Sequence, residues 1–325
     1  MRSSSRPAVR ALSADADAGS AKNSAPWQEP DAVLRRDANW NGVRRARPLL
    51  GTCVAVAVGG LPEAAAHAAI DEAFAAIGRI EACMSYHRAD SDVTRLNRAA
   101  PGACVPVDPD THAVLAEAVR IAALSDGAFD PTVAGALVAG GVLFAPADAR
   151  PPDPAASWRD LALLPGHRVR LERPLWLDLG GIAKGYAVDR ALAVLAARGA
   201  ARACVEAGGD LRVMGPDPER VALRTAGAGP VATIALTEGA LASSSSRPED
   251  GGAAAFQHRD GADRRRAAPA RFACVVAETC IRADALTKVV LVRGAASRPL
   301  LDRLGVAAYL QEADGRWRSL GRAAA

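Results

Sequence analysis

Residues 177–191, LDLGGIAKGYAVDRA, constrain the fold more than any other part of the sequence. The apolar run in residues 174–181 predicts a buried strand that ends in a glycine turn, and residues 184–198 predict a helix with one apolar face. Amide groups at a helix start, beside the ammonium of Lys184, attract phosphate. A carboxylate at Asp178, next to free carbonyl groups and phosphate, also suits a divalent cation. A plain strand-to-helix turn would explain an isolated glycine pair without any function, and the spacing fits neither a Walker loop nor a GxGxxG fingerprint.

The remaining hydrophobic periodicity predicts an α+β fold. The chain has 325 residues, half of them apolar, so it can bury a substantial core as two domains or as one composite body. Helices are predicted from Pro62, over 109–127, from about Asp284 and over 298–304. Strands are predicted at 52–58, 203–207, 210–214, 231–236, 272–277 and 289–292, with a strand pair at the C-terminus.

Composition argues against two classes of partner. The net charge is only +4 and aromatic residues make up 4%, whereas nucleic-acid binders concentrate positive charge on one face, so nucleic acid is not an expected partner. No stretch runs about 18 apolar residues without a charge, so stable membrane insertion is not expected. Residues 1–45 lack a secretory apolar region and are expected to form a disordered leader before a domain at 46–325. A polar, glycine-rich stretch at 247–270 predicts a long loop.

The cysteine pattern indicates a reducing compartment. Six cysteines occur without a CxxC pair or a short Cys/His spacing, so a zinc site is not expected. Several lie in apolar runs that predict strands, and we interpret all six as reduced core residues rather than disulfides.

A second segment that can carry chemistry is IRADALTKVVLV, residues 281–292. On a helix, Asp284 and Thr287 are i,i+3 neighbours, so a carboxylate and a hydroxyl share one face. Two such oxygens near a helix start could hold Mg²⁺ against a phosphate. An N-terminal helix cap at Asp284 is the simpler explanation and stays open.

Two further segments have both a structural and a functional interpretation. Residues 127–137, GAFDPTVAGAL, contain a DPT sequence that ordinarily marks a turn and a helix start. Residues 205–213, VEAGGDLRV, contain a glycine pair that a hairpin or bulge explains, but that also allows a flat ligand to approach the backbone.

The order of these segments resembles the FAD:protein FMN transferase family, also called ApbE and formerly described as a thiamine-biosynthesis lipoprotein. The resemblance begins at RPLLGT (47–52) and covers the chain from there to the C-terminus. It is carried by MSYHRADSDVTRLN (84–97), GAFDPTVAGAL, LDLGGIAKGYAVDRA, VEAGGDLRV, LASSSS (241–246) and ADALTKVVLV. The resemblance implies a mixed α/β fold with two lobes around a flavin cleft, FAD as donor substrate and Mg²⁺ as cofactor.

The resemblance also implies roles for individual residues. The flavin-contacting positions would be Leu50, Tyr86, Ala128, Phe129, Asp130, Asp178 and Lys184. The metal ligands would be the carbonyl of Gly181, the Asp284 carboxylate and the Thr287 hydroxyl, and the catalytic residues would be Asp284, Lys184 and Asp178. The implied reaction is Mg²⁺-dependent transfer of FMN from FAD to a Ser or Thr hydroxyl of an acceptor protein, a redox-chain subunit, with release of AMP. We expect Asp284→Ala to abolish transfer and leave the fold intact.

Three features depart from the family's pattern. Lys288 stands where many relatives carry a threonine, and a protonated lysine cannot ligate Mg²⁺, so either Thr287 replaces it or Lys288 contacts phosphate. An HxxDPxTG-like segment of the family corresponds here to HRDGADRRRAAP, with Asp260 as the likeliest equivalent. The leader is unlike that of exported relatives, and we expect a cytoplasmic protein.

Two alternatives to the transferase remain open at this point. The same site could hydrolyse FAD to free FMN and AMP, because water would then replace the acceptor hydroxyl. The chain could also be a flavin-binding protein without activity, a view that Lys288 and the altered 256–267 segment favour.

Overall fold

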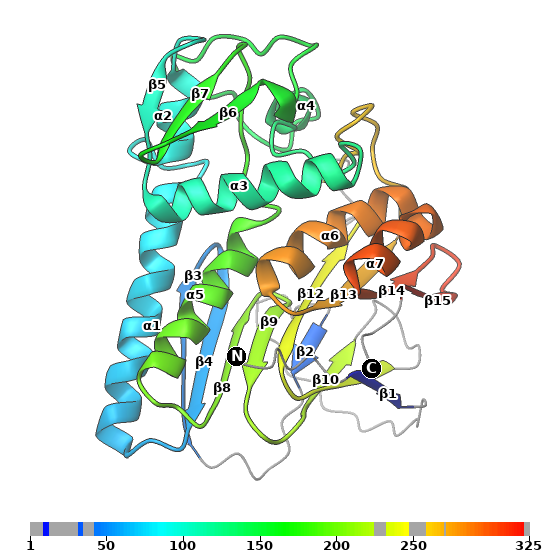
Figure 1. The fold of residues 1–325 in the computed structure, drawn as a ribbon. Helices are drawn as coiled ribbons and strands as arrows, with labels where there is room; N and C mark the ends of the chain where they lie inside the picture. The colour runs from blue at the N-terminus through cyan, green and yellow to red at the C-terminus, as the bar shows by residue number, and fades with distance from the viewer. Residues whose placement is uncertain are drawn as a thin grey trace.

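The computed structural model describes residues 9–12, 32–34, 42–223, 232–246, 258–269 and 271–321. An eight-stranded sheet lies at its centre, with the order β15-β14-β13-β12-β9-β8-β4-β3, and every neighbouring pair is antiparallel (Figure 1). Its strands are β3 (Val43–Leu49), β4 (Thr52–Gly59), β8 (Arg202–Ala207), β9 (Asp210–Met214), β12 (Gly239–Ser245), β13 (Phe272–Ala277), β14 (Ala307–Gln311) and β15 (Trp317–Leu320). The predicted strands at 52–58, 203–207, 210–214 and 272–277 and the C-terminal pair are thereby confirmed.

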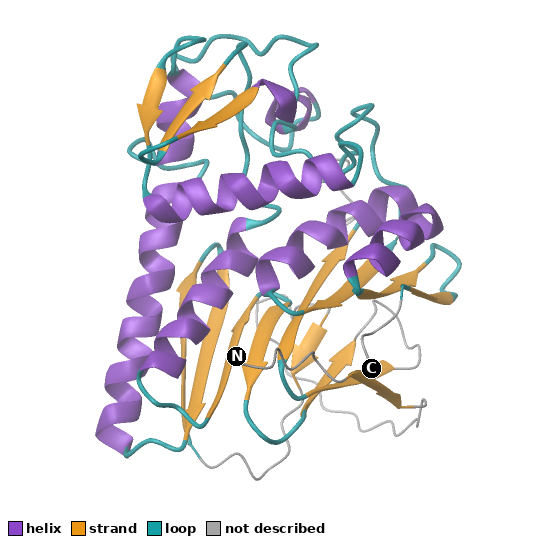
Figure 2. Cartoon of the chain, viewed as in Figure 1, coloured by secondary structure: helices purple, strands orange, loops and turns teal. Residues whose placement is uncertain are grey.

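Helices cover one face of this sheet, as Figure 2 shows. They are α1 (Glu63–Met84), α5 (Ala183–Ala197) and α6 (Cys280–Arg293), followed by the short α7 (Arg298–Leu304). The apolar stripe of α1 explains its position, because Ile70, Phe74, Ile77 and Ile80 are all buried in the main core.

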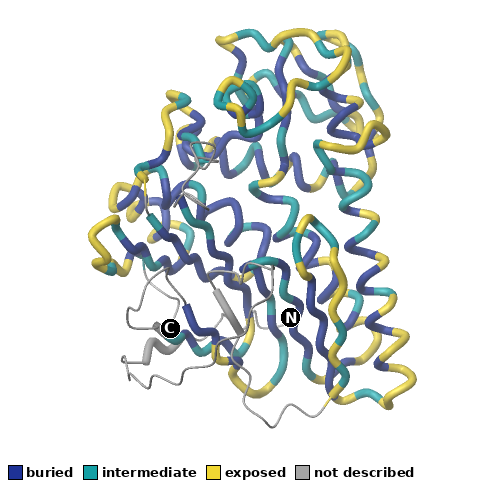
Figure 3. Tube along the Cα trace, turned by 180° about the vertical axis from the view of Figure 1, so that it is seen from behind, coloured by how far each residue is buried: buried dark blue, intermediate teal, exposed yellow. Residues whose placement is uncertain are grey.

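The central strands are buried on both faces, and alternate residues enter different cores. On β13, Val275 joins the core beneath the helices, whereas Cys274 and Val276 join a second core with Val221 and Ile234. These last two residues belong to β10 (Glu219–Leu223) and β11 (Ala232–Leu236) of a smaller sheet. Figure 3 shows the buried positions along the strands. Burial on both faces explains why β13 is apolar throughout.

The smaller sheet has the order β1-β11-β10-β2 and includes two short strands from the predicted leader, β1 (Val9–Leu12) and β2 (Ala32–Leu34). Antiparallel pairing joins β1 to β11 and β2 to β10. The rest of the leader up to residue 41 lies outside the described residues, so its disorder stays a prediction.

A capping lobe, residues 92–171, lies beyond one end of the large sheet (Figure 1). It contains α2 (Asp92–Arg98), α3 (Pro109–Leu124), α4 (Ala134–Ala139), the 3-10 turn Trp158–Asp160 and the sheet β5-β7-β6. These strands are β5 (Cys104–Pro106), β6 (Leu161–Leu164) and β7 (Arg168–Leu171). The α3 helix crosses above α5 and α6 and joins the two parts.

Residues 174–181 do not form the predicted strand. The segment is extended and largely buried, but it belongs to none of the described sheets. The Asn97 side chain takes the place of a neighbouring strand, because its amide donates to the Leu177 carbonyl at 3.0 Å and its oxygen accepts the Leu177 N–H at 2.7 Å. The Asp178 N–H donates to the Pro131 carbonyl. These bonds satisfy a buried backbone without a sheet.

The α6 helix differs from the prediction at both ends. It begins at Cys280, four residues before Asp284, and it continues through residues 289–292, which were predicted as a strand. Asp189 of α5 accepts the backbone N–H groups of Cys280 and Ile281 at 2.9 Å each, and so caps the helix from a distant part of the sequence. Asp284 is therefore an interior helix residue and not the N-cap.

The cysteine prediction holds for half of the set. All six cysteines are free, but only Cys204, Cys274 and Cys280 are buried. Cys53 and Cys104 are exposed and Cys83 is half-buried, so the prediction that all are core residues is wrong. None of the helices in the described ranges combines the length and the apolar character that a bilayer span requires.

Candidate functional site

A cavity of about 410 Å³ opens between the sheet body and the capping lobe. Its walls come from the β3–β4 turn, the loop before α4, the segment that precedes α5, the 258–259 loop and α6. Six residues predicted from the sequence line it: Leu50, Ala128, Phe129, Asp130, Asp178 and Gly181. The sequence therefore predicted six residues that meet at a single cavity.

Tyr86, Lys184, Asp284 and Thr287 do not belong to the lining of this cavity. The Tyr86 hydroxyl donates to the Phe144 carbonyl at 2.9 Å, next to the cavity wall. Burial and the nearby Asp178 charge raise the pKa of Tyr86 to about 12. The tyrosine is therefore a neutral hydrogen-bond donor at the edge of the site.

The β3–β4 turn holds Leu50 in a left-handed conformation with φ of 56°, followed by Gly51 at 69°. A two-residue hairpin turn of type I′ requires positive φ at both positions, which an Asn-Gly pair ordinarily provides. The Leu50 N–H donates to Glu81 Oε1 at 2.9 Å, and this bond helps to hold the conformation. An apolar side chain is thus kept at the cavity wall despite backbone strain.

Asp130 lines the cavity, but its oxygens are already engaged. Oδ1 accepts the Thr132 N–H at 2.8 Å and the Thr132 hydroxyl at 2.7 Å, and Oδ2 lies 3.3 Å from the Arg264 guanidinium. Burial raises the pKa of Asp130 although Arg264 opposes it. The residue joins the capping lobe to the 258–269 loop, of which the described part has one isolated bridge, from Arg259 to Arg266.

Asp260 of the same loop forms an ion pair with Arg293 at the end of α6, with Nε and Oδ2 2.8 Å apart. It is buried and does not line the cavity. Residues 247–257 and 270 of the predicted loop lie outside the described residues.

Asp178 sits at the cavity wall with its carboxylate partly free. Its Oδ1 accepts the Gly180 N–H at 3.0 Å. Burial raises the pKa of Asp178, while the Gly180 bond and the charges of His87 and Lys288 act in the opposite direction. A carboxylate with a raised pKa at a cavity wall is a candidate proton acceptor.

Four charged side chains form a buried charge cluster beside the cavity: Asp210, Asp284, Lys184 and Lys288. Lys184 Nζ lies 3.0 Å from Asp210 Oδ2, and Lys288 Nζ forms an ion pair with Asp284 Oδ1. Both aspartates are 0% exposed. Two buried carboxylates therefore balance two partly buried ammonium groups.

The two aspartates of this cluster titrate in opposite directions. Burial and the charge of Asp284 raise the pKa of Asp210 to about 6, although Lys184 opposes this shift. Burial alone would also raise the pKa of Asp284, but Lys288 and Lys184 outweigh it and hold that pKa below its usual range. Asp284 is thus the more firmly ionised carboxylate.

Close packing of α5 on α6 places this cluster. The Gly185 N–H donates to Asp284 Oδ2 at 3.1 Å. A Cβ added at Gly185 would lie 2.8 Å from the Asp284 Cβ and nearer still to the Cys280 carbonyl oxygen. Only glycine allows the two helices to meet at this distance.

We expect Gly185→Ala to lower the free energy of unfolding by about 1–3 kcal/mol, because the added methyl group pushes the helices apart. Urea denaturation measures this change. Gly78 on α1 is the matched control, since a Cβ there meets no atom within 4 Å. Gly78→Ala should leave stability unchanged or raise it by up to about 1 kcal/mol. Equal effects of the two substitutions would contradict the packing argument.

The glycine turn and α6 converge as expected, but the space between them holds a lysine. A Cβ at Gly181 would lie 3.3 Å from Lys288 Cε. Asp284 Oδ1 is paired with Lys288 and Oδ2 with Gly185, while the Thr287 hydroxyl donates to the Asp284 carbonyl at 2.6 Å. The described ranges contain no group of three or more His, Cys, Asp or Glu side chains that could hold a metal ion. In this arrangement the predicted ligands do not fit Mg²⁺.

Sequence reasoning missed several residues of the site. Asp210 and Ser244 lie in motifs that were recognised as a glycine hairpin and as LASSSS, but neither was assigned a role. His258 lines the cavity beside Lys288. Charge balance explains the place of Asp210, because a fully buried carboxylate requires a cationic partner, which Lys184 provides.

The pKa of His258 falls to about 3 from its ordinary 6.5, because burial and the Lys288 charge disfavour the imidazolium. The unfolded chain takes up this proton below pH 6.5 and the folded chain does so only near pH 3. The free energy of unfolding should therefore decrease as the pH is lowered from 6.5 to 3, by up to about 1.4 kcal/mol per pH unit. Urea denaturation of His258→Gln should show a weaker dependence than the wild type over this window. Identical pH dependence would contradict the neutral state of His258.

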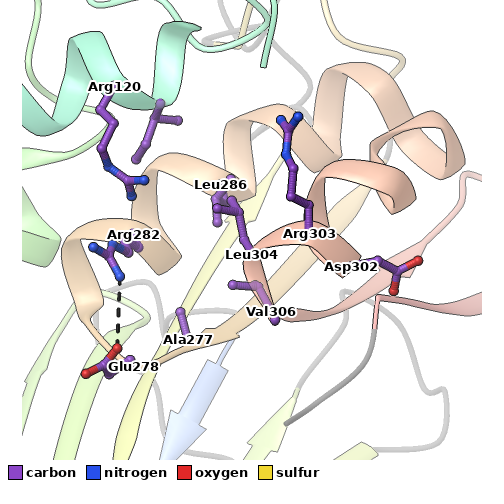
Figure 4. A pocket seen from close by; sticks show the side chains of 11 residues that line it. Arg120, Ala277, Glu278, Arg282, Leu286, Asp302, Arg303, Leu304 and Val306 are labelled. Atoms are coloured by element: carbon purple, nitrogen blue, oxygen red, sulfur yellow. Dashed lines mark ion pairs between the residues drawn. The ribbon is translucent and has the colours of Figure 1, made fainter. Parts of the chain in front are cut away.

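A second cavity, of about 460 Å³, lies between α3, α6 and α7 (Figure 4). Its arginines all have acceptors: Arg120 and Arg282 bind Glu117, and Arg303 binds the Leu124 carbonyl. The guanidinium groups that give this cavity its positive charge are therefore already hydrogen-bonded. None of the site residues predicted above lines it.

The fold and the first cavity define a two-lobed α+β protein with a polar, charged site between the lobes. The sequence model described as the ApbE family matches residues 50–310, and the chain belongs to this family. The ApbE protein from Thermotoga maritima has a similar structure, with a TM-score of 0.70 and 26% identity over 86% of this chain and 96% of that one.

Two curated relatives are named FAD:protein FMN transferase. The protein from Rhodobacter capsulatus is 32% identical over 291 residues, which are 82% of this chain and 54% of that protein. The protein from Treponema pallidum is 33% identical over 187 residues, which are 53% of this chain and 51% of that protein. The chain thus spans about half the length of the curated relatives that it matches.

Proposed function

We propose that this chain transfers FMN from FAD to a Ser or Thr hydroxyl of an acceptor protein and releases AMP. The observation that carries the proposal is the single cavity in which five residues predicted for flavin binding, and Gly181 predicted as a metal ligand, meet Lys288 and His258. Membership of the ApbE family and the names of the two curated relatives support the same reaction.

The cavity combines the surfaces that such a donor requires. Leu50, Ala128 and Phe129 offer an apolar wall for an isoalloxazine ring, and Lys288 offers positive charge for a diphosphate. FAD's diphosphate is a stable anionic anhydride, so its cleavage depends on charge neutralisation and alignment more than on covalent chemistry by the protein.

In the proposed step the acceptor oxygen forms a bond to the phosphorus of FMN. The bond from that phosphorus to the bridging oxygen breaks, and its electron pair leaves with AMP. The hydroxyl proton passes to a group at the cavity wall. Asp178 and His258 both line the cavity, and we assign this role to Asp178 because Lys288 disfavours a protonated His258.

Lys184 and Asp284 act in this proposal through the cluster and not by direct contact, because neither lines the cavity. Lys184 neutralises Asp210, and Asp284 holds Lys288 in position. The Mg²⁺ implied by the resemblance takes no part in the step, since two of its expected ligands, Asp284 and Thr287, are engaged with each other and Asp284 is paired with Lys288.

For the acceptor we propose only a class of protein: a redox-chain subunit that presents a Thr or Ser near an Asp. A cytoplasmic location likewise stays a prediction.

Mass spectrometry of synthetic peptides tests the reaction. The purified protein is incubated with FAD and peptides that present a threonine near an aspartate, and each peptide has a matched version with valine in place of threonine. The proposal predicts that some threonine peptides gain one FMN less one water, with equimolar AMP, and that no valine peptide does so. Release of free FMN with every peptide would instead identify an FAD pyrophosphatase. Tight binding of intact FAD without AMP release would identify a flavin-binding protein.

A further inference from the structure

Lys288 occupies the position between the glycine turn and Asp284 where the family pattern would place a metal ion. It lies one helical turn after Asp284 on α6, so both side chains are on the same helix face. Nζ forms an ion pair with Asp284 Oδ1 and donates to Ser244 Oγ on β12 at 3.1 Å. Its stem packs beside Gly181. Contacts from α6, β12 and the glycine turn thus fix the ammonium.

The oxygens nearest to this ammonium are already engaged with other groups. Asp284 Oδ2 accepts the Gly185 N–H, and the Thr287 hydroxyl both donates to the Asp284 carbonyl and lies 2.8 Å from Ser244 Oγ. Mg²⁺ requires six oxygen ligands in near-octahedral geometry. Binding it here would require Lys288 to leave and these bonds to break.

The charge balance of the cluster also argues against a divalent ion at this position. The buried charge cluster is neutral with Asp210, Asp284, Lys184 and Lys288 all ionised. In the absence of a bound anion, a divalent cation added to it would leave two uncompensated positive charges beside two carboxylates that are 0% exposed. Uncompensated buried charge is strongly unfavourable.

The ammonium also has the capacity to bind a ligand. A lysine has three N–H donors, and two of them reach Asp284 and Ser244. Lys288 lines the cavity with Asp178 and Gly181, and its side chain is 15% exposed. The third N–H has no acceptor within the described part of the chain, so it is available to an oxygen of a bound anion.

We propose that the Lys288 ammonium is the resident cation of this site, so that the chain binds the diphosphate of FAD and transfers FMN without Mg²⁺. The inference rests on the proposed function. Lys288 contacts the diphosphate, while the departing electron pair is taken by AMP and the hydroxyl proton by Asp178. Ser244 and Asp284 hold the ammonium and replace water molecules that would otherwise hydrate it.

Metal binding and FAD turnover, measured separately, test this inference. Protein treated with EDTA is titrated with Mn²⁺ as a paramagnetic probe of the Mg²⁺ site, and AMP release from FAD is followed in EDTA and in Mg²⁺ with the threonine peptides as acceptors. We expect no Mn²⁺ binding by the wild type and equal AMP release under both conditions. Lys288→Thr should acquire one Mn²⁺ site, because it frees Asp284 Oδ1 and adds a hydroxyl, and its AMP release should require Mg²⁺.

Lys288→Met removes the ammonium without supplying a ligand and should lower AMP release by on the order of 10²-fold or more. Arg282→Met is the control for charge removal from α6, because Arg282 is partly exposed and pairs with Glu117 away from this cavity. It should match the wild type. Circular dichroism identifies any variant that fails to fold, and the wild-type measurements do not depend on the variants.

Mn²⁺ binding by the wild type, or AMP release that EDTA abolishes and Mg²⁺ restores, would overturn the inference. If the wild type releases no AMP under any condition, the proposed function fails, but the Mn²⁺ titration still decides the role of Lys288. Mn²⁺ binding by Lys288→Thr, and not by the wild type, would then support Lys288 as the resident cation.

Discussion

Asp284→Ala is expected to lower the free energy of unfolding by about 3–5 kcal/mol, because it leaves the Lys288 ammonium largely buried without its carboxylate. Urea denaturation at neutral pH measures the loss. The same variant should lose FMN transfer, since Lys288 is no longer held at the cavity. The expectation that this substitution leaves the fold intact is therefore revised on the basis of the ion pair.

The double variant Asp284→Ala/Lys288→Met separates charge from packing. It removes both members of the ion pair, so no charge remains uncompensated, and it should recover much of the stability that the single variant loses. Transfer should stay absent, because the ammonium is missing. If the double variant were as unstable as Asp284→Ala alone, the loss would come from packing and not from the unpaired lysine.

Asp178→Asn is expected to lower the transfer rate by about 10²–10⁴-fold at unchanged FAD affinity, because the amide cannot accept the hydroxyl proton. The fold should be preserved, since an asparagine oxygen can still accept the Gly180 N–H. The rate is measured as AMP release in the presence of a threonine peptide.

Asp90→Asn is the matched control, because Asp90 is an exposed carboxylate paired with Arg88 and does not line the cavity. It should transfer FMN at the wild-type rate. Full activity of Asp178→Asn would contradict the assignment, and His258→Gln would then be the variant to lose activity.

The sequence predicted local periodicity well and long-range partners poorly. The helix over residues 298–304 and the strands β9 and β13 match their predictions residue for residue, because each is a short run with a strong local composition signal. Residues 289–292 have the β-branched composition of a strand, yet Val289, Val290 and Leu291 pack into the main core as part of a helix. Tertiary packing outweighs their local propensity.

Two other differences between the predicted and the observed elements also arise from tertiary contacts. The start of α6 depends on Asp189, which is 91 residues from Cys280 and gives no signal near the helix. The apolar run at 174–181 resembles a strand, but its backbone partner is the side chain of Asn97, 80 residues from Leu177. No local pattern contains either contact.

The sequence motifs predicted the cavity lining better than they predicted the metal ligands. Six of the predicted residues meet at one cavity, because the motifs that contain them place loops at the junction of the two lobes. The metal ligands could not be judged from spacing alone, since the occupant of their oxygens depends on where the Lys288 side chain lies. Sequence reasoning identified Lys288 as a departure, and its ion pair gives that departure a physical meaning.

A crystal structure of Asp178→Asn with FAD bound in the absence of Mg²⁺ tests the central claim most directly. The account predicts FAD in the cavity between the lobes, with the flavin against Leu50 and Phe129 and a diphosphate oxygen within hydrogen-bonding distance of Lys288 Nζ. FAD bound elsewhere, or a diphosphate that does not contact Lys288, would contradict it.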